Sequence, residues 1–438
     1  MEQEDSWGAL PPKPPTRSVT PLDPPYVPGS AVPPPLVGPG QSPGGGPEPR
    51  DFDPAAVVAA LQRVLPGERP LALHEPRFAG REEAYLKDCL ATGWVSSAGP
   101  YVDRFERMLA ERCGVARAVA VVNGTAGLHT ALMLAGVRPG DEVLVPALTF
   151  VATANAVSQC GAIPHFVDSG RRTLGLDPEG LDRHLHRIAA PGPDGPVNRD
   201  TGRRIAAVVP VHVFGHPVAM EPLNEVAARW RLVVIEDATE ALGSRYRGRP
   251  AGALARLAVL SFNGNKIITT GGGGAVLTDD PALADAARHL TTTAKLPHPW
   301  RFEHDRVAYN YRMPNLNAAL GCAQLEQLEG ILEAKRWLAG CYREALSGLP
   351  GVEVVMEPPD CESNHWLNAL LVPDPAARDA LLAAGHAAGL LLRPAWRLMP
   401  ALPMYQDCPR ASLPVAEALE ARLVCLPSGP ALIGPGCH

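Results

Sequence analysis

Short apolar runs alternate with helical segments through the central part of the chain, and this alternation constrains the fold more than any other feature. Strands that are apolar on both faces and alternate with helices are typical of a mainly parallel α/β sheet covered on both sides. In such sheets, ligands bind at the carboxyl ends of the strands. The expected strands are residues 119–122, 142–146, 163–168, 205–212 and 232–237, and two more near 257–262 and 274–278. The expected intervening helices are residues 124–133, about 152–160, and 221–230.

Helix signals lie on both sides of this region. Asp53 is a favoured helix cap and Pro54 fits the first helical position, so we expect the ordered chain to begin there. Apolar residues then recur on one helix face over residues 57–65. The pattern also predicts continuous helix over residues 81–113 and one long helix at about 314–346.

The first 50 residues differ in composition from the rest. Residues 1–50 hold 15 of the 48 Pro and 7 of the 42 Gly, with few aliphatic side chains. Such a segment buries too little apolar surface to offset its chain entropy, so we predict a disordered extension. The remaining chain exceeds what one hydrophobic core usually supports. We predict a large α/β domain over residues 51–313 and a smaller α+β unit over 314–438.

Charge and hydropathy exclude several classes of function. A formal net charge of −6 argues against a broad basic surface for nucleic acid. No apolar run reaches the roughly 18 residues of a membrane helix, and the acidic N-terminus is unlike a signal peptide. Nine singly placed Cys are typical of reduced thiols, and the His spacing indicates no metal site. We therefore expect a cytoplasmic protein with no nucleic-acid or membrane partner.

Three features at predicted strand ends carry chemistry. The first is the turn Asn123-Gly124-Thr125-Ala126 between a strand and a helix. Its glycine permits close backbone approach, its Thr supplies a hydroxyl, and the helix start offers free N–H groups, which together suit a phosphate. A purely structural turn of small residues remains an alternative.

The other two features are a carboxylate and an amine. Asp237 ends the apolar run 232–237, where a buried carboxylate needs a partner such as a cationic ring nitrogen; a helix cap is the alternative role. Lys266 follows a strand and precedes the glycines 271–274, where partial desolvation would favour an amine nucleophile over a solvated surface charge. The glycines do not match a P-loop and predict a tight turn.

The order of these features indicates a pyridoxal 5′-phosphate (PLP) site. In this interpretation the phosphate binds at the turn, Asp237 pairs with the pyridinium nitrogen and Lys266 forms the Schiff base. A dinucleotide-binding dehydrogenase is the rival interpretation, but the first strand is not followed by its Gly-x-Gly-x-x-Gly pattern.

The chain resembles the DegT/DnrJ/EryC1/StrS sugar aminotransferases over about residues 70–428. The motifs that carry this resemblance are residues 123–126, 236–244, 261–266 and 309–313. Residues 73–78, 94–97, 315–326 and 402–405 are similar to the LegC/PglE subgroup. The resemblance implies a fold-type I enzyme with a large sheet domain and a small C-terminal domain. It also implies amino transfer from glutamate to the 4-keto carbon of a UDP-linked 4-keto-6-deoxy-GlcNAc.

The resemblance assigns roles to individual residues. Lys266 matches the Schiff-base Lys, Asp237 the partner of the pyridine nitrogen, and Phe150 the aromatic that stacks on the ring. Asn310 matches an Asn that the other subunit donates to the phosphate, which implies a homodimer with shared active sites. The cofactor-binding residues implied in this way are Gly124, Thr125, Ala126, Phe150, Asp237, Glu240, Ser261, Lys266 and Asn310. Glu240 stands where many members have Gln or His near the ring hydroxyl.

The substrate contacts are predicted from side-chain chemistry. Aromatic rings stack on a base or sugar, and Arg grips a pyrophosphate. The candidates are Trp94, Arg312, His365, Arg393 and Trp396, with core packing or structural ion pairs as the alternative roles. Leu392 replaces the more polar residue expected in the subgroup.

The predicted reaction moves an amino group in two stages through pyridoxamine phosphate. Lys266 is the expected base, and Asp237 keeps the ring nitrogen protonated. A sugar dehydratase of the same family would carry His in place of Lys266. A GDP- or dTDP-linked substrate and a non-catalytic PLP-binding regulator stay open as alternatives.

Overall fold

The computed structural model describes residues 52–65 and 67–432, and the predicted extension over residues 1–50 lies outside the described residues. The helices are α1 (Pro54–Val64), α2 (Glu82–Thr92), α3 (Pro100–Cys113), α4 (Gly124–Leu134), α5 (Val151–Gln159), α6 (Pro178–Ile188), α7 (Met220–Trp230), α8 (Pro281–Thr291), α9 (Asn315–Leu325), α10 (Leu328–Leu346), α11 (Pro375–Ala387) and α12 (Pro414–Arg422). The strands are β1 (Arg117–Val121), β2 (Glu142–Pro146), β3 (Ile163–Val167), β4 (Ala189–Ala190), β5 (Val197–Asn198), β6 (Ile205–Val208), β7 (Val233–Asp237), β8 (Arg245–Tyr246), β9 (Arg249–Pro250), β10 (Leu257–Ser261), β11 (Gly274–Thr278), β12 (Glu353–Val354), β13 (Cys361–Glu362), β14 (Asn368–Leu371), β15 (Arg393–Pro394) and β16 (Leu423–Leu426).

A seven-stranded sheet organises the larger part of the described chain. Its strand order is β1-β11-β10-β7-β6-β2-β3. The pairs from β10 through β3 are all parallel, whereas β11 runs antiparallel to both β1 and β10. The predicted mainly parallel α/β sheet is therefore confirmed. Because β1 runs in the same direction as β10, the carboxyl ends of β1, β2, β7 and β10 meet at one edge of the sheet.

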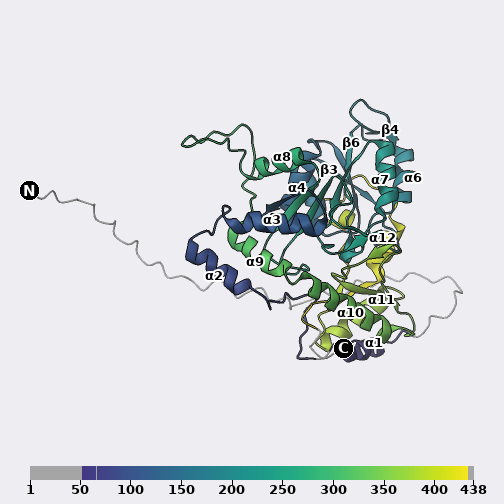
Figure 1. The fold of residues 1–438 in the computed structure, drawn as a ribbon. Coiled ribbons are helices and arrows are strands. Elements are labelled where there is room, and N and C mark those ends of the chain that lie inside the picture. Colours follow the sequence, from purple (N-terminus) through teal and green to yellow (C-terminus); the bar gives the residue numbers. More distant parts are fainter. Residues whose placement is uncertain (1–51, 66, 433–438) are drawn as a thin grey trace, which may run out of the picture. The chain divides into compact units, whose positions relative to one another are not determined.

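Helices cover both faces of this sheet, as the apolar strands require. In β2, Val143 and Val145 belong to the core that also holds apolar side chains of α4 and α5. Leu144, which points to the opposite face, belongs to the core shared with α6 and α7. Figure 1 shows α6 and α7 on one side of β3 and β6, and α4 and α8 on the other.

The predicted strands form, and two of them have the predicted bounds. These two are β2 and β11. The strand predicted over residues 205–212 is shorter, because β6 ends at Val208. Pro210 follows and has no N–H group to donate to the ladder, so regular pairing stops before it.

The helix predicted over residues 81–113 is two helices, and that prediction was wrong. Gly93, with φ of 75°, ends α2, and Pro100 begins α3. Gly99 has φ of 152°, and a Cβ there would lie 2.5 Å from the Asn315 side-chain oxygen, so only glycine fits. The intervening residues lead the chain from α2 to α3 across the end of α9.

The long helix predicted at about residues 314–346 is also divided. It breaks between α9 and α10 at Glu326 and Gln327. Near this break, the side-chain amides of Gln324 and Gln327 donate to the same oxygen of buried Glu82, at 2.7 and 2.6 Å. The break thus aligns two amides on one carboxylate of α2, an arrangement that helical periodicity does not reveal.

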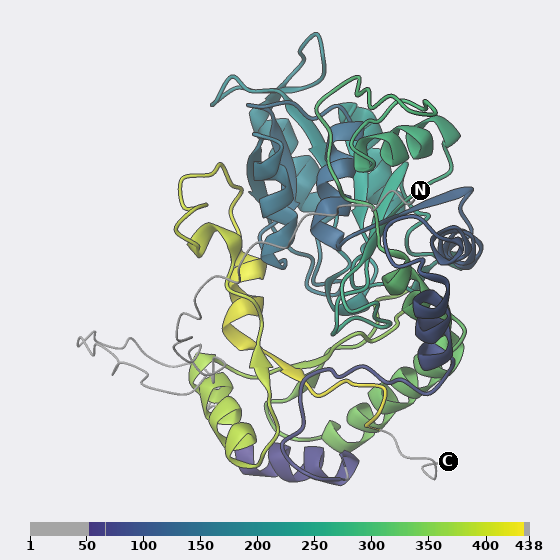
Figure 2. The ribbon, with the colours of Figure 1, turned by 90° about the vertical axis from the view of Figure 1, so that its left-hand side faces the viewer.

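A second, four-stranded sheet lies in the C-terminal part of the chain. Its order is β12-β14-β16-β15, and every pair is antiparallel. Its core includes Leu61 of α1 together with Tyr342 of α10 and Leu381 of α11. Figure 2 shows α1 beside these two helices, away from the seven-stranded sheet. The division at residues 313 and 314 stays a prediction, and the first described helix shares the core of the second sheet.

Candidate active site

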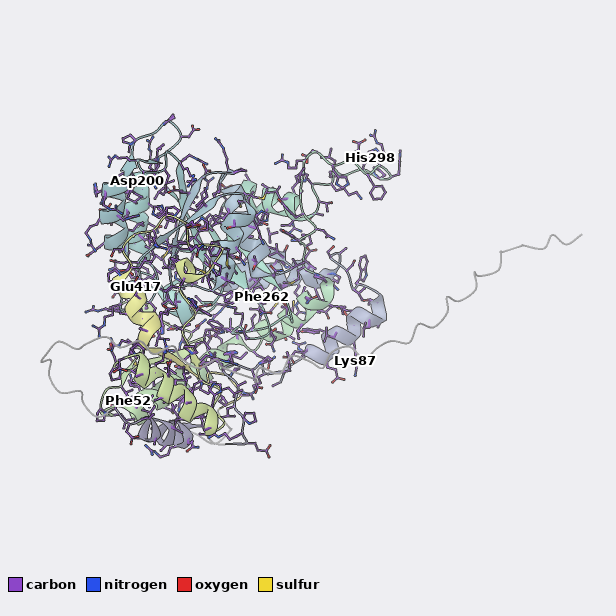
Figure 3. All side chains as sticks on the ribbon, turned by 180° about the vertical axis from the view of Figure 1, so that it is seen from behind. Phe52, Lys87, Asp200, Phe262, His298 and Glu417 are labelled. Atoms are coloured by element: carbon purple, nitrogen blue, oxygen red, sulfur yellow. The ribbon has the colours of Figure 1, made fainter. Side chains whose placement is uncertain are left out.

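A cavity of about 300 Å³ lies at the carboxyl ends of the strands in the seven-stranded sheet. The predicted site residues that line it are Gly124, Thr125, Phe150, Asp237, Glu240, Ser261, Lys266 and Trp396. They come from segments up to 272 residues apart (Gly124 to Trp396), and all except Trp396 lie at or after the ends of strands of the seven-stranded sheet. Phe262, the residue after Ser261, is fully buried and is labelled near the middle of the view in Figure 3.

The first turn of α4 forms one wall of the cavity. Asn123 caps this helix, and its side-chain oxygen accepts a hydrogen bond from the Ala126 N–H group at 2.8 Å. The N–H groups of Gly124 and Thr125, which have no acceptor within the helix, remain for a ligand. With the positive end of the helix dipole and the Ser261 hydroxyl beside them, they fit a phosphate.

Close packing beside this turn depends on Gly274. A Cβ on Gly274 would lie 2.6 Å from the carbonyl carbon of Asn123, closer than non-bonded atoms approach. The absence of a side chain therefore lets β11 pass directly behind the turn.

Asp237 ends β7 as a buried carboxylate on the cavity wall. It is 2% exposed. The Thr153 hydroxyl donates to one carboxylate oxygen at 2.8 Å, and the Thr239 hydroxyl donates to the other at 2.7 Å. These neutral donors orient the carboxylate without neutralising its charge. A cationic ring N–H group in the cavity would supply that charge, so Asp237 fits the nitrogen of a pyridinium ring.

Lys266 carries the amine of the site. Its side chain is 12% exposed, and its Nζ lies 3.5 Å from Glu240 Oε1. The other carboxylate oxygen of Glu240 accepts a hydrogen bond from the Phe214 backbone N–H at 2.9 Å. Burial raises the pKa of Glu240 to about 7, and the charge of Asp237 adds to this, whereas Lys266 acts in the opposite direction.

Aromatic side chains form the wall opposite the strand ends. Phe150 lines the cavity and is 52% exposed. Its ring centroid lies 6.3 Å from that of Trp396, which in turn lies 5.0 Å from that of Phe214. Phe150 is thus available to stack on a planar ring, and Trp396 closes the cavity from the C-terminal part of the chain.

Four predicted residues lie outside this cavity. The N–H group of Ala126 is already bonded to Asn123. Trp94 is 52% exposed in the segment between α2 and α3, and Arg393 is exposed on β15. Asn310 is exposed at the end of the segment 292–310, which projects from the sheet where Figure 3 labels His298.

Two further predicted residues have structural partners. Arg312 is buried, and its guanidinium pairs with Glu106 at 2.8 Å and donates to the Ala120 carbonyl at 2.9 Å. The ring of His365 packs edge-on against His216, with 5.6 Å between the centroids. These contacts match the alternative roles considered for an Arg or a His in these positions.

Several residues that line the cavity were not predicted. They are Asn123, Leu128, Thr149, Ala152, Thr153, Val211, Thr239, Asn263, Asn265 and Trp366. Asn123 and Thr239 stand inside motifs that the sequence analysis used, so position within a motif could have identified them. Trp366 comes from the C-terminal part of the chain and carries no local signal.

These features together define a fold-type I PLP-dependent enzyme. A helix N-terminus for the phosphate, a buried Asp for the ring nitrogen and a Lys amine surround one cavity at the sheet edge. The model of the DegT/DnrJ/EryC1/StrS aminotransferase family matches residues 76–434, and the chain belongs to this family. It is a PLP-dependent sugar aminotransferase.

Known relatives cover most of the chain. A GDP-perosamine synthase of Caulobacter vibrioides is 38% identical over 352 residues, which are 80% of this chain and 90% of the relative. A putative pyridoxal phosphate-dependent aminotransferase of Bacillus subtilis, EpsN, is 35% identical over 82% of this chain and 91% of its own length. The crystal structure of DesI with its TDP-sugar product matches with a TM-score of 0.74 at 32% identity, covering 86% of this chain and 93% of DesI.

Neither a cluster of metal-ligating side chains nor a membrane-spanning helix occurs in the described residues. Within residues 52–65 and 67–432, no group of three or more His, Cys, Asp and Glu side chains is arranged to hold a metal ion. In the same part of the chain, every helix is too short or too polar to cross a membrane.

The raised pKa of Glu240 predicts how the stability of the cofactor-free chain depends on pH. Below pH 4.5 the carboxyl is protonated in both the folded and the unfolded chain. Between pH 4.5 and about 7 the folded chain keeps the proton and the unfolded chain loses it, so the free energy of unfolding falls as the pH rises. The fall is at most about 3 kcal/mol.

Glu240→Gln removes this titration. The melting temperatures of Glu240→Gln and the wild type are measured without cofactor. We expect the difference between them, variant minus wild type, to increase as the pH is raised from 5 to 7.5. Glu417→Gln, which changes an exposed Glu of α12, is the matched control and should show no such trend. A difference between Glu240→Gln and the wild type that stays constant over this range would contradict the prediction.

Proposed function

We propose that this chain transfers an amino group from an amino acid, glutamate, to the 4-keto carbon of a nucleotide-linked 4-keto-6-deoxy sugar. The observation that carries the proposal is the shared cavity of Asp237, Lys266 and the N-terminus of α4. Bound PLP supplies an electron sink for the electrons released when the donor loses its Cα proton. The side chains around the cavity supply the binding, the orientation and the proton transfers.

Each of these side chains has a defined task. Asp237, oriented by Thr153 and Thr239, keeps a proton on the ring nitrogen. The amine of Lys266 takes the Cα proton from the amino-acid donor. In the second stage, in which the sugar receives the amino group, the same amine delivers a proton to the sugar carbon. Glu240, whose pKa is raised to about 7 by burial in the cofactor-free chain, would serve as a donor or an acceptor toward the ring hydroxyl.

Three observations each favour a different nucleotide in the substrate. The relative named GDP-perosamine synthase favours a GDP-linked sugar. The motifs shared with the LegC/PglE subgroup favour UDP-linked 4-keto-6-deoxy-GlcNAc, and the DesI complex with a TDP-sugar makes a dTDP-linked sugar the third candidate. Trp396, which lines the cavity, is the proposed contact of the sugar, with Trp94, His365 and Arg393 as further candidates for the nucleotide.

We also propose a cytoplasmic homodimer in which Asn310 completes the phosphate site of the partner subunit. Asn310 is exposed and does not line the cavity of its own chain. The segment 292–310 that ends there exposes Trp300, Phe302 and Val307 by 78%, 79% and 86%. Three large apolar side chains exposed on one projecting segment are typical of a surface that packs against another protein.

Amino transfer to three nucleotide sugars tests the proposed reaction. The PLP-loaded chain is incubated with glutamate and the GDP-, UDP- or dTDP-linked 4-keto-6-deoxy sugar, and 2-oxoglutarate and the amino sugar are measured by mass spectrometry. We expect turnover with one of the three. Lys266→Ala should lower it by at least about 100-fold, the size of a lost general base. PLP binding without transfer to any of the sugars would instead support a non-catalytic regulator.

Mixed dimers test the shared site. Lys266→Ala and Asn310→Ala chains, each inactive alone, are co-expressed with different tags, and the mixed dimer is purified through both tags. One of its two sites then combines a native Lys266 with a native Asn310 of the partner subunit. We expect about half of the wild-type activity per dimer, because one of two equivalent sites is intact. An inactive mixed dimer would show that Asn310 acts within its own chain, and an Asn310→Ala chain that is fully active alone would show that Asn310 plays no part in the site.

A further inference from the structure

The amine of Lys266 lies close to two groups of different chemistry. Glu240 Oε1 is 3.5 Å from Nζ, and the ring centroid of Trp366 is 4.0 Å from Nζ. Trp366 is 4% exposed, so water is largely excluded from this contact. An ammonium within about 6 Å of an indole face is attracted to it, and Trp attracts cations more strongly than Tyr or Phe does.

Trp366 is held in place by three hydrogen bonds. Its indole Nε1–H donates to the carbonyl of Asn265, the residue before Lys266, at 2.6 Å. Its backbone N–H donates to the Asn364 side chain at 2.8 Å, and its carbonyl accepts from the fully buried Lys335 at 3.1 Å. With the ring and the backbone both fixed, the indole keeps one face toward the amine.

The two groups that flank the amine share one supporting residue. The side-chain amide of Asn364 donates to the carbonyls of Glu240 and Leu242, both at 2.9 Å, while its oxygen accepts from Trp366. A Cβ on Gly215 would lie 1.9 Å from that oxygen, so a glycine is required for Asn364 to reach this position. Asn364 therefore fixes Glu240 and Trp366 relative to each other.

We propose that Trp366 is a positioning residue for Lys266, whose indole face holds the ε-amine against Glu240 and stabilises its cationic form. This inference rests on the proposed function, in which Lys266 carries the cofactor and moves the proton. The other charged or titratable groups near the amine are Glu240 and Asp237, which line the same cavity, and buried His74. Trp366 differs from all of them because it adds no charge that changes with pH.

The pH midpoint of the visible absorption change of the PLP-loaded chain tests this role. That change follows protonation at Nζ of Lys266, so losing a group that stabilises the cation moves the midpoint down. We expect Trp366→Leu to lower it by about one pH unit. Trp366→Phe, which keeps a weaker aromatic face and loses the bond to Asn265, should lower it by less. Trp337→Leu, which changes a partly exposed Trp of α10, is the control and should leave it unchanged.

The outcomes separate this inference from the proposed function. A wild-type chain that gains no visible band with PLP would overturn both. A normal wild-type band with the same midpoint in Trp366→Leu and Trp366→Phe would overturn the role of Trp366 alone. If Trp366→Leu does not fold, the smaller substitution Trp366→Phe decides the question by whether its midpoint moves down.

Discussion

The burial of two carboxylates next to one amine is the constraint on which the rest of the site depends. Asp237 and Glu240 are 2% and 3% exposed, and Glu240 Oε1 lies 3.5 Å from the Lys266 amine. Unpaired charges are costly in such surroundings. The fold limits this cost with the hydroxyls of Thr153 and Thr239 on Asp237 and with a backbone N–H on Glu240. These hydroxyls leave the negative charge of Asp237 uncompensated, and a cationic ring nitrogen bound beside it would compensate that charge.

The second sheet matters because it supplies two aromatic side chains of the cavity wall. Trp366 precedes β14 and Trp396 follows β15, so both indoles are carried by the strands of the four-stranded sheet. Lys335 of α10 joins this sheet to the site through the carbonyl of Trp366. The packing of the C-terminal part of the chain therefore bears directly on the surroundings of the amine, although the two carboxylates and the amine all come from the first sheet and its loops.

The sequence predicts those parts of the structure that depend on residues close together in the chain. Apolar runs reveal the parallel strands, and polar residues at their ends, such as Asp237 and Lys266, are recognisable because parallel strands end at one edge. The contacts of Trp366 and Thr153 depend on chain segments far apart in the sequence, which leave no local pattern. The break at Gly93 was hidden by the apolar spacing on both sides of it, and the break at Gln327 involves neither Gly nor Pro. The partner of Arg312, Glu106, is likewise visible only once the chain is folded.

Borohydride reduction of the PLP-loaded chain, followed by peptide mapping, tests the central claim most directly. The reduction makes the bond between the cofactor and an amine permanent, and mass spectrometry locates the modified residue. The account predicts that the cofactor is found on Lys266 and that Lys266→Ala carries none in the corresponding peptide. Attachment to another lysine, or a chain that takes up no PLP, would contradict the account.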